Sequence, residues 1–122
     1  MINIYAAWIG FLLGCIAGAV PGLFFHKENW LGGYGSWKRR MIRLGHIAFW
    51  GIGFLNLSFG LTAKAFGLDM ENSAASILLI IGAIAMPLTC YLSAWKPFFR
   101  NFFFIPALSV TFAILLFLTR IL

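Results

Sequence analysis

Four long apolar runs, joined by short polar connections, divide this sequence of 122 residues. The runs cover residues 4–25, 41–63, 74–95 and 98–118, and each is close to the roughly 20 residues that a helix needs to cross a bilayer. None alternates with the period of two that is typical of a barrel strand. Because lipid offers the backbone no hydrogen bonds, each run must be helical. We therefore predict an all-α integral membrane protein with four transmembrane helices arranged as a bundle.

The charge content agrees with a membrane location. Charged residues make up 10% of the chain and hydrophobic residues 62%, whereas roughly a quarter of a soluble domain is charged. The length fits one domain, residues 1–122. The cations lie in or beside the short connections, and a nucleic-acid partner would need a broad basic face on a soluble surface instead. We expect membrane lipids and other membrane subunits as partners, and no nucleic acid.

The cations are divided unequally between the two sides of the predicted bundle. Positively charged residues near span ends tend to face the cytoplasm. The side with the first and third connections carries Lys27, Lys38, Arg39, Arg40, Arg43, Lys96 and Arg100. The opposite side, which holds both termini, carries Lys64 and Arg120. This asymmetry predicts both termini outside the cell, in a multi-pass protein of the bacterial cytoplasmic (inner) membrane.

A glycine recurs every four residues through the first run, at Gly10, Gly14, Gly18 and Gly22. Four residues turn a helix by about 400°, so these glycines stay on one face and form a glycine zipper. Small residues at this spacing bring two membrane helices close together, and we expect this face to contact the second helix or a helix of another protein. In the second run, Asn56 lies near the middle of the bilayer, where its amide needs an interhelical hydrogen bond.

The predicted spans hold few groups that could perform chemistry. All three acids lie outside the runs, and no cation lies deep inside one. Proton and ion pathways usually contain ionisable groups within the membrane, and acid–base catalysis needs a positioned, tunable pair. We therefore expect that the chain is not an enzyme.

The histidines are the candidate cofactor ligands. His46 lies inside the second run and His26 follows the first run on the same side, so two imidazoles from neighbouring helices would suit a b-type haem. Met86 and Cys90 share one face of the third run, and together with His46 they would suit Cu(I). The alternative for His46 is a structural role, with its ring bonded to a carbonyl or a lipid phosphate.

The connection between the first two runs combines aromatic and basic residues. They are Trp30, Trp37, Lys38, Arg39, Arg40 and Arg43. Amphipathic aromatic rings settle at the headgroup level, and clustered cations bind anionic lipid heads such as cardiolipin. We expect this segment to lie in the headgroup layer. The alternative is that these cations only set the orientation of the chain.

The function that these patterns favour is a non-catalytic accessory or assembly subunit of a larger membrane complex. The glycine face and the basic aromatic connection are its expected docking surfaces, and a respiratory or other energy-transducing complex is the expected host. Two alternatives stay open. One is a haem- or copper-binding membrane protein that uses the ligands above, and the other is a small dimeric transporter.

Overall fold

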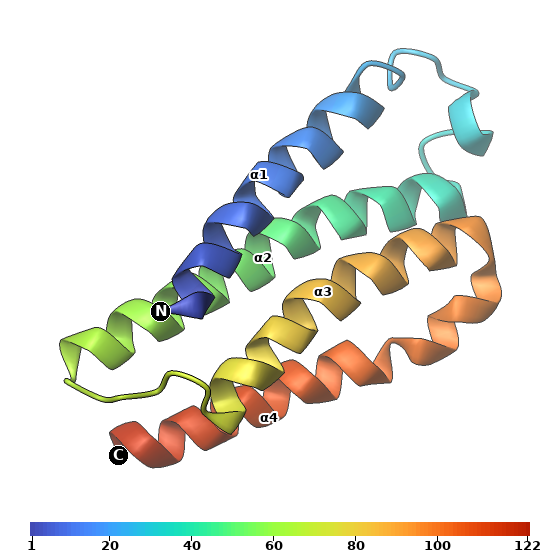
Figure 1. Cartoon of the computed structure of the whole chain (residues 1–122). Helices are drawn as coiled ribbons and strands as arrows, with labels where there is room; N and C mark the ends of the chain where they lie inside the picture. The colour runs from blue at the N-terminus through green and yellow to red at the C-terminus, as the bar shows by residue number, and fades with distance from the viewer.

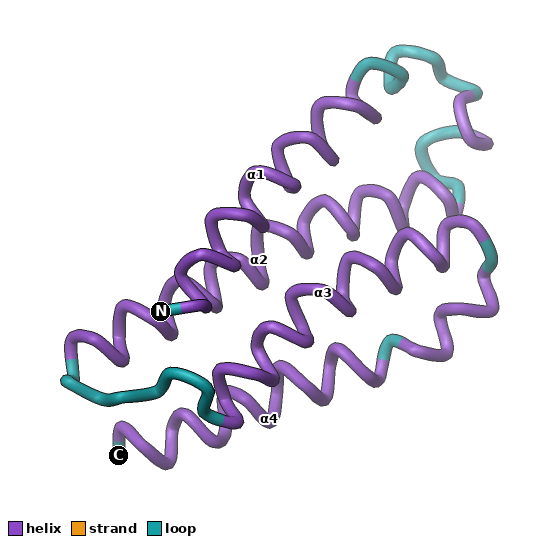
Figure 2. The backbone as a smooth tube through the Cα atoms, viewed as in Figure 1, coloured by secondary structure: helices purple, strands orange, loops and turns teal.

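The computed structural model, which describes residues 1–122, is built from helices without strands (Figures 1 and 2). Its elements are α1 (Ile2–Gly22), the 3₁₀ helix η1 (Trp30–Gly32), α2 (Trp37–Ala65), α3 (Ala74–Trp95), the 3₁₀ helix η2 (Pro97–Phe102) and α4 (Phe104–Ile121). The first three α-helices, and α4 together with η2, are long and apolar enough to cross a membrane. The predicted all-α fold with four membrane-spanning helices is confirmed, and the chain is a small multi-pass membrane protein.

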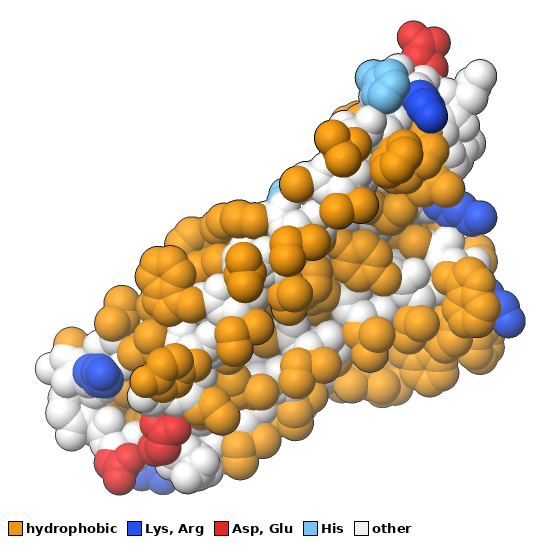
Figure 3. Space-filling model, turned by 45° about the horizontal axis from the view of Figure 1, so that its top comes forward, with side chains coloured by type: hydrophobic (Ala, Val, Ile, Leu, Met, Phe, Trp, Pro, Cys, Tyr) orange, Lys and Arg blue, Asp and Glu red, His pale blue; other side chains and the backbone are white.

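The connections alternate between the two ends of the molecule. Both termini and the α2–α3 connection lie at one end, which we call the terminal end, and the other two connections lie at the opposite end (Figure 1). That opposite end carries most of the cations, and we call it the basic end. On the face that Figure 3 shows, hydrophobic side chains predominate along the length between the two ends. The expected gathering of cations at one end is therefore present, while the orientation of that end in the cell stays a prediction.

The helix boundaries at the basic end differ from the predicted ones. α1 ends at Gly22, slightly earlier than predicted, and the chain continues in turns. α2 begins at Trp37, earlier than predicted, because Ser36 caps it: the Ser36 hydroxyl accepts a hydrogen bond from the backbone N of Arg39 at 3.2 Å. Such a cap gives a partner to a backbone donor that the first turn of a helix would otherwise leave unpaired.

The fourth predicted span begins with η2 instead of an α-helix. Pro97 starts η2, and α4 begins only at Phe104. Pro106 lies in the first turn of α4, and in a continuous α-helix its ring would clash with the carbonyl of Phe102. This proline therefore separates η2 from α4, a break that the continuous span predicted for residues 98–118 did not include.

The four helices form an open bundle. α1 packs along α2, α3 packs against both α2 and α4, and α1 touches α3 over a short stretch and α4 not at all. Large side chains bridge α2 and α4, as where the ring centroids of Phe59 and Phe117 lie 4.6 Å apart. Grooves therefore remain between α1 and α3 and between α2 and α4.

A buried polar cluster joins α1, α2 and α3. Asn3 donates a hydrogen bond through Nδ2 to Asn56 Oδ1 at 2.8 Å, and the Ser76 hydroxyl donates to Asn3 Oδ1. Asn56 itself donates through Nδ2 to the backbone oxygens of Ile52 at 3.0 Å and Leu79 at 3.3 Å. A side-chain hydrogen bond between membrane helices contributes on average about 0.6 kcal/mol. Asn56 thus has the interhelical bonds that its position requires, and their partners were not evident from the sequence.

Candidate functional site

An opening with two polar side chains lies between α1 and α2 at the basic end. We call it the wedge, a cavity of about 180 Å³ that forms where the two helices separate. It is lined by Ala17, Gly18, Pro21, Gly22, Phe25, Ile42, Arg43 and His46. Most of these residues are small or apolar, so its polar groups come from Arg43 and His46.

His46 forms the floor of the wedge and joins its two walls. Its Nδ1 lies 2.8 Å from the backbone oxygen of Gly14 on α1, and because a carbonyl only accepts, Nδ1 is the donor. The ring rests on the backbone of α1 at Gly18, where a Cβ would lie 2.5 Å from the His46 Cε1. This geometry matches the structural alternative, in which the ring is bonded to a carbonyl. It leaves Nε2 as the ring nitrogen that is free to bond with another molecule.

Arg43 stands at the mouth of the wedge, about one helical turn from His46. Its Nη1 donates a hydrogen bond to the backbone oxygen of Tyr34 at 2.9 Å. The same guanidinium lies 4.1 Å from the centroid of the Tyr34 ring. These two contacts fix the direction of the side chain, and they leave further N–H groups of the guanidinium unused.

Arg39 is not at the lipid surface, although the sequence placed it in the headgroup layer. The residue is only 3% exposed, and its guanidinium lies 5.5 Å from the Phe25 ring centroid and 5.4 Å from that of Trp30. Its Nη2 donates to the backbone oxygen of Lys27, and its Nε has no partner. Arg39 therefore organises the α1–α2 connection from inside, through cation–π contacts that strengthen when the cation is removed from water.

The other members of the predicted headgroup segment divide into exposed and packed side chains. Lys38 and Arg40 are exposed, and the Arg40 guanidinium lies 5.7 Å from the Trp37 ring centroid. Trp37 Nε1 donates a hydrogen bond to the backbone oxygen of Ser93 at 2.7 Å. This indole therefore joins the start of α2 to the end of α3.

Three of the four glycines of the first run face α2. A Cβ at Gly10 would lie 3.4 Å from the Phe49 backbone oxygen, and one at Gly14 would lie 2.7 Å from Trp50 Nε1. Gly18 holds the ring of His46, as described above. A Cβ at Gly22 would meet nothing within 4 Å. Of the two partners expected for this face, the structure therefore gives it α2 of the same chain.

The remaining cofactor candidates lie apart from His46. His26 is exposed in the turns that follow α1 and does not line the wedge. Cys90 is buried on α3 beside Gly45 of α2, whereas His46 turns towards α1. Met86 is half-buried on α3. The structure thus assembles neither the pair expected for haem nor the set expected for copper.

A long groove runs between α1 and α3, with α2 as its floor. It consists of two adjoining cavities of about 220 and 350 Å³ that share Leu13 and Phe49 as lining residues. The α1 wall extends from Ala6 to Pro21, a length of about 22 Å at the helical rise. We call this the α1–α3 groove.

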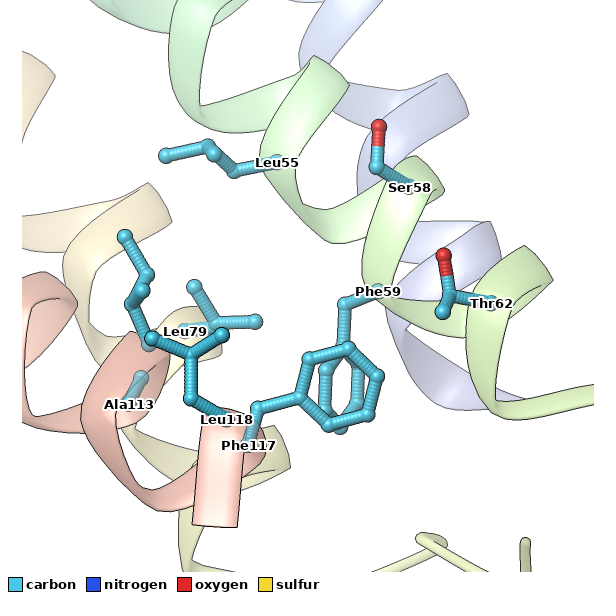
Figure 4. A pocket seen from close by; sticks show the side chains of 9 residues that line it. Leu55, Ser58, Phe59, Thr62, Leu79, Ala113, Phe117 and Leu118 are labelled. Carbon is cyan, nitrogen blue, oxygen red and sulfur yellow. The ribbon is translucent and has the colours of Figure 1, made fainter. Parts of the chain in front are cut away.

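A smaller cleft of about 140 Å³ opens between α2, α3 and α4 (Figure 4). Leu79 and Phe117 line it from α3 and α4, and Ser58 and Thr62 lie one turn apart on its α2 side (Figure 4). Apart from these two hydroxyls its lining is apolar. The cleft follows from the packing of α4 against α3 instead of α2.

Among these openings, only the wedge joins a fixed guanidinium and a free imidazole nitrogen to an apolar wall. The guanidinium can donate hydrogen bonds to an anionic group, and the free imidazole nitrogen can accept one from a hydroxyl. The α1–α3 groove, in contrast, offers surface for packing.

The chain matches no protein-family model, no curated protein and no solved structure.

Proposed function

We propose that this chain is a non-catalytic accessory subunit of a larger membrane complex, and that a transmembrane helix of its partner packs into the α1–α3 groove. The proposal rests on the groove itself, which is unfilled by the chain. Its α1 wall is about as long as fifteen helical residues, or about 22 Å, which is most of the roughly 30 Å of a bilayer's hydrocarbon core. A groove of this length suits a helix that crosses the membrane beside it.

The residues that line the groove support helix packing. Ala6, Gly53 and Ala83 are small residues from three different helices that line it. Membrane helices pack where small side chains let backbones approach, because lipid tails provide no hydrophobic driving force between them. Larger apolar side chains such as Ile84, which is 64% exposed, offer matching ridges.

The docking surface of this proposal differs from the one that the glycine spacing suggests. Since α2 covers Gly10, Gly14 and Gly18, the partner helix meets the neighbouring face of α1. The membrane is proposed to be a bacterial cytoplasmic membrane, with the basic end on the cytoplasmic side, because seven of the nine cations, counted above, lie there. An energy-transducing complex is the proposed host class.

The test fills the groove with one large side chain. Ala83→Trp places an indole in the groove, and Ala107→Trp makes the same change at an exposed position of α4. Tagged variants are solubilised gently from the native membrane, separated on a native gel and recovered by affinity pull-down. We expect the wild type and Ala107→Trp to migrate with a heterologous partner, and Ala83→Trp to be released from it.

Three results would contradict the proposal. The first is a wild-type chain that migrates alone at every detergent concentration tested. The second is an assembly that contains only copies of this chain, since the groove would then serve self-association. The third is retention of the partner by Ala83→Trp, which would place the docking surface elsewhere.

A further inference from the structure

We propose that the wedge between α1 and α2 binds the headgroup of an anionic phospholipid that also carries hydroxyls, as phosphatidylglycerol does. In this arrangement the phosphate meets Arg43 at the mouth, and a headgroup hydroxyl donates a hydrogen bond to His46 Nε2 on the floor. The proposal does not depend on a partner subunit. The wedge is a different cavity from the α1–α3 groove, and Ala17 and Pro21 line both.

The charge balance at the basic end supports an anion. Arg43 is half-buried and forms no ion pair, since the only ion pair in the structure joins the amino group of Met1 to Glu71 at the terminal end. Arg39 stands nearby in the sequence, 3% exposed and also without an acid. Cations that are withdrawn from water without a counter-charge are costly, and a phosphate at the mouth of the wedge would offset that cost.

The contacts of the Arg43 side chain favour its guanidinium as the position where the phosphate binds. The Tyr34 ring and carbonyl hold the Arg43 guanidinium in place, and the group keeps further N–H donors that a ligand can use. Guanidinium groups bind phosphate through two parallel hydrogen bonds, and a fixed guanidinium loses less side-chain entropy on binding. The cavity volume of about 180 Å³ accommodates a headgroup and not a whole lipid, so the acyl chains remain in the bilayer.

The position of the wedge favours a lipid over free phosphate. The wedge lies at the end of two membrane-spanning helices, where headgroups are concentrated. Its remaining walls, such as Pro21 and Ile42, are apolar and suit the carbon atoms of a headgroup and its glycerol. Basic pockets between transmembrane helices are known sites for anionic headgroups, and Arg43 is the cation that lines this one.

Two matched pairs of variants test the site in the full-length chain. Gly22→Leu fills the wedge without a steric clash, because a Cβ at Gly22 meets nothing within 4 Å, and Gly51→Leu makes the same change at another such glycine outside the wedge. Arg43→Gln removes the proposed phosphate ligand, and Lys38→Gln removes an exposed charge at the same end.

Binding is measured by native mass spectrometry after incubation with phosphatidylglycerol, phosphatidylcholine or inorganic phosphate. We expect the wild type to retain phosphatidylglycerol at least about tenfold better than phosphatidylcholine, a difference of about 1.4 kcal/mol. Gly22→Leu and Arg43→Gln should lose this preference, while Gly51→Leu and Lys38→Gln keep it. Circular dichroism of each variant verifies that it is folded.

Three outcomes would overturn the proposal. The first is equal retention of the two lipids by the wild type. The second is an unchanged preference in Gly22→Leu or in Arg43→Gln, which would mean that the lipid binds outside the wedge. The third is displacement of the lipid by inorganic phosphate at equal concentration, which would identify a site for the free anion.

Discussion

Asn3 and Asn56 join their side-chain amides across the α1–α2 contact at 2.8 Å, and neither side chain has any exposed surface. With the Ser76 hydroxyl and the backbone oxygens of Ile52, Ser76 and Leu79, these amides form a closed set of hydrogen bonds. Because the bonds connect three helices, they fix how far each helix can slide along its neighbour. The cluster is therefore the best place to test whether the helices pack in this register.

Asn56→Leu should destabilise the protein by about 1–3 kcal/mol, because it removes the acceptor of one buried N–H of the Asn3 amide. Unfolding in a mixed micelle, followed by circular dichroism, measures the loss. Thr111→Val is a suitable control, since the Thr111 hydroxyl bonds only within α4 and is exposed. A double-mutant cycle of Asn3 and Asn56 should give a coupling energy of up to about 1.7 kcal/mol. A coupling of zero would contradict the contact.

Gly14→Leu should force α1 away from α2, because even a Cβ at Gly14 would lie 2.7 Å from Trp50 Nε1. Overfilling a packed contact typically costs about 1–3 kcal/mol. Gly22→Leu adds the same side chain to the same helix where no atom lies within 4 Å, and its stability should match that of the wild type. Equal thermal stability of Gly14→Leu and Gly22→Leu would show that α2 does not cover the glycine face.

Trp37→Phe keeps an aromatic ring but removes the donor that bonds the Ser93 backbone oxygen at 2.7 Å. We expect a loss of about 1 kcal/mol, concentrated at the basic end of α3. Hydrogen exchange should become faster in the last turn of α3 and stay unchanged near Asn56. Trp95→Phe is the control, because Trp95 is 66% exposed. Identical exchange in the two variants would count against this bond.

Arg39→Gln should loosen the α1–α2 connection, since the guanidinium between Phe25 and Trp30 is lost. Limited proteolysis of the variant should cut within residues 23–36 faster than in the wild type. Arg39→Lys should rescue only in part, because an ammonium lacks the planar group that stacks on aromatic rings. Lys38→Gln, at an exposed position, should leave the cleavage rate unchanged. Slow cleavage of Arg39→Gln would mean that the connection is held by other contacts.

The fold could be predicted from the sequence because the bilayer restricts the possible structures. A long uncharged run such as residues 74–95 can only be a helix in lipid, and α3 has these bounds. Pro106 could be expected to kink or loosen the fourth helix, but the start of α4 at Phe104, after a separate 3₁₀ helix, was not predicted. The early start of α2 was missed as well, although Ser36 is a typical N-cap residue and was the available signal.

The site residues were predictable in kind but not in arrangement. His46 stood out because a histidine within a span is unusual, and its bond to the Gly14 carbonyl agrees with one of the two roles considered. Which side of a helix faces which neighbour depends on packing. The sequence therefore could not show that His46 turns towards α1 and away from Cys90 on α3. Nor could the sequence show that Arg39 is buried among aromatic rings while its neighbour Arg40 is exposed.

The central claim is that four helices cross the membrane with the basic end in the cytoplasm. Single cysteines introduced in a background without Cys15 and Cys90 test it, with a membrane-impermeant thiol reagent applied to intact cells. Asn72→Cys, in the α2–α3 connection, should be labelled at once. Gly35→Cys and Lys96→Cys, in the connections at the basic end, should be labelled only after the membrane is permeabilised. Labelling of Gly35→Cys in intact cells, or protection of Asn72→Cys, would contradict this topology.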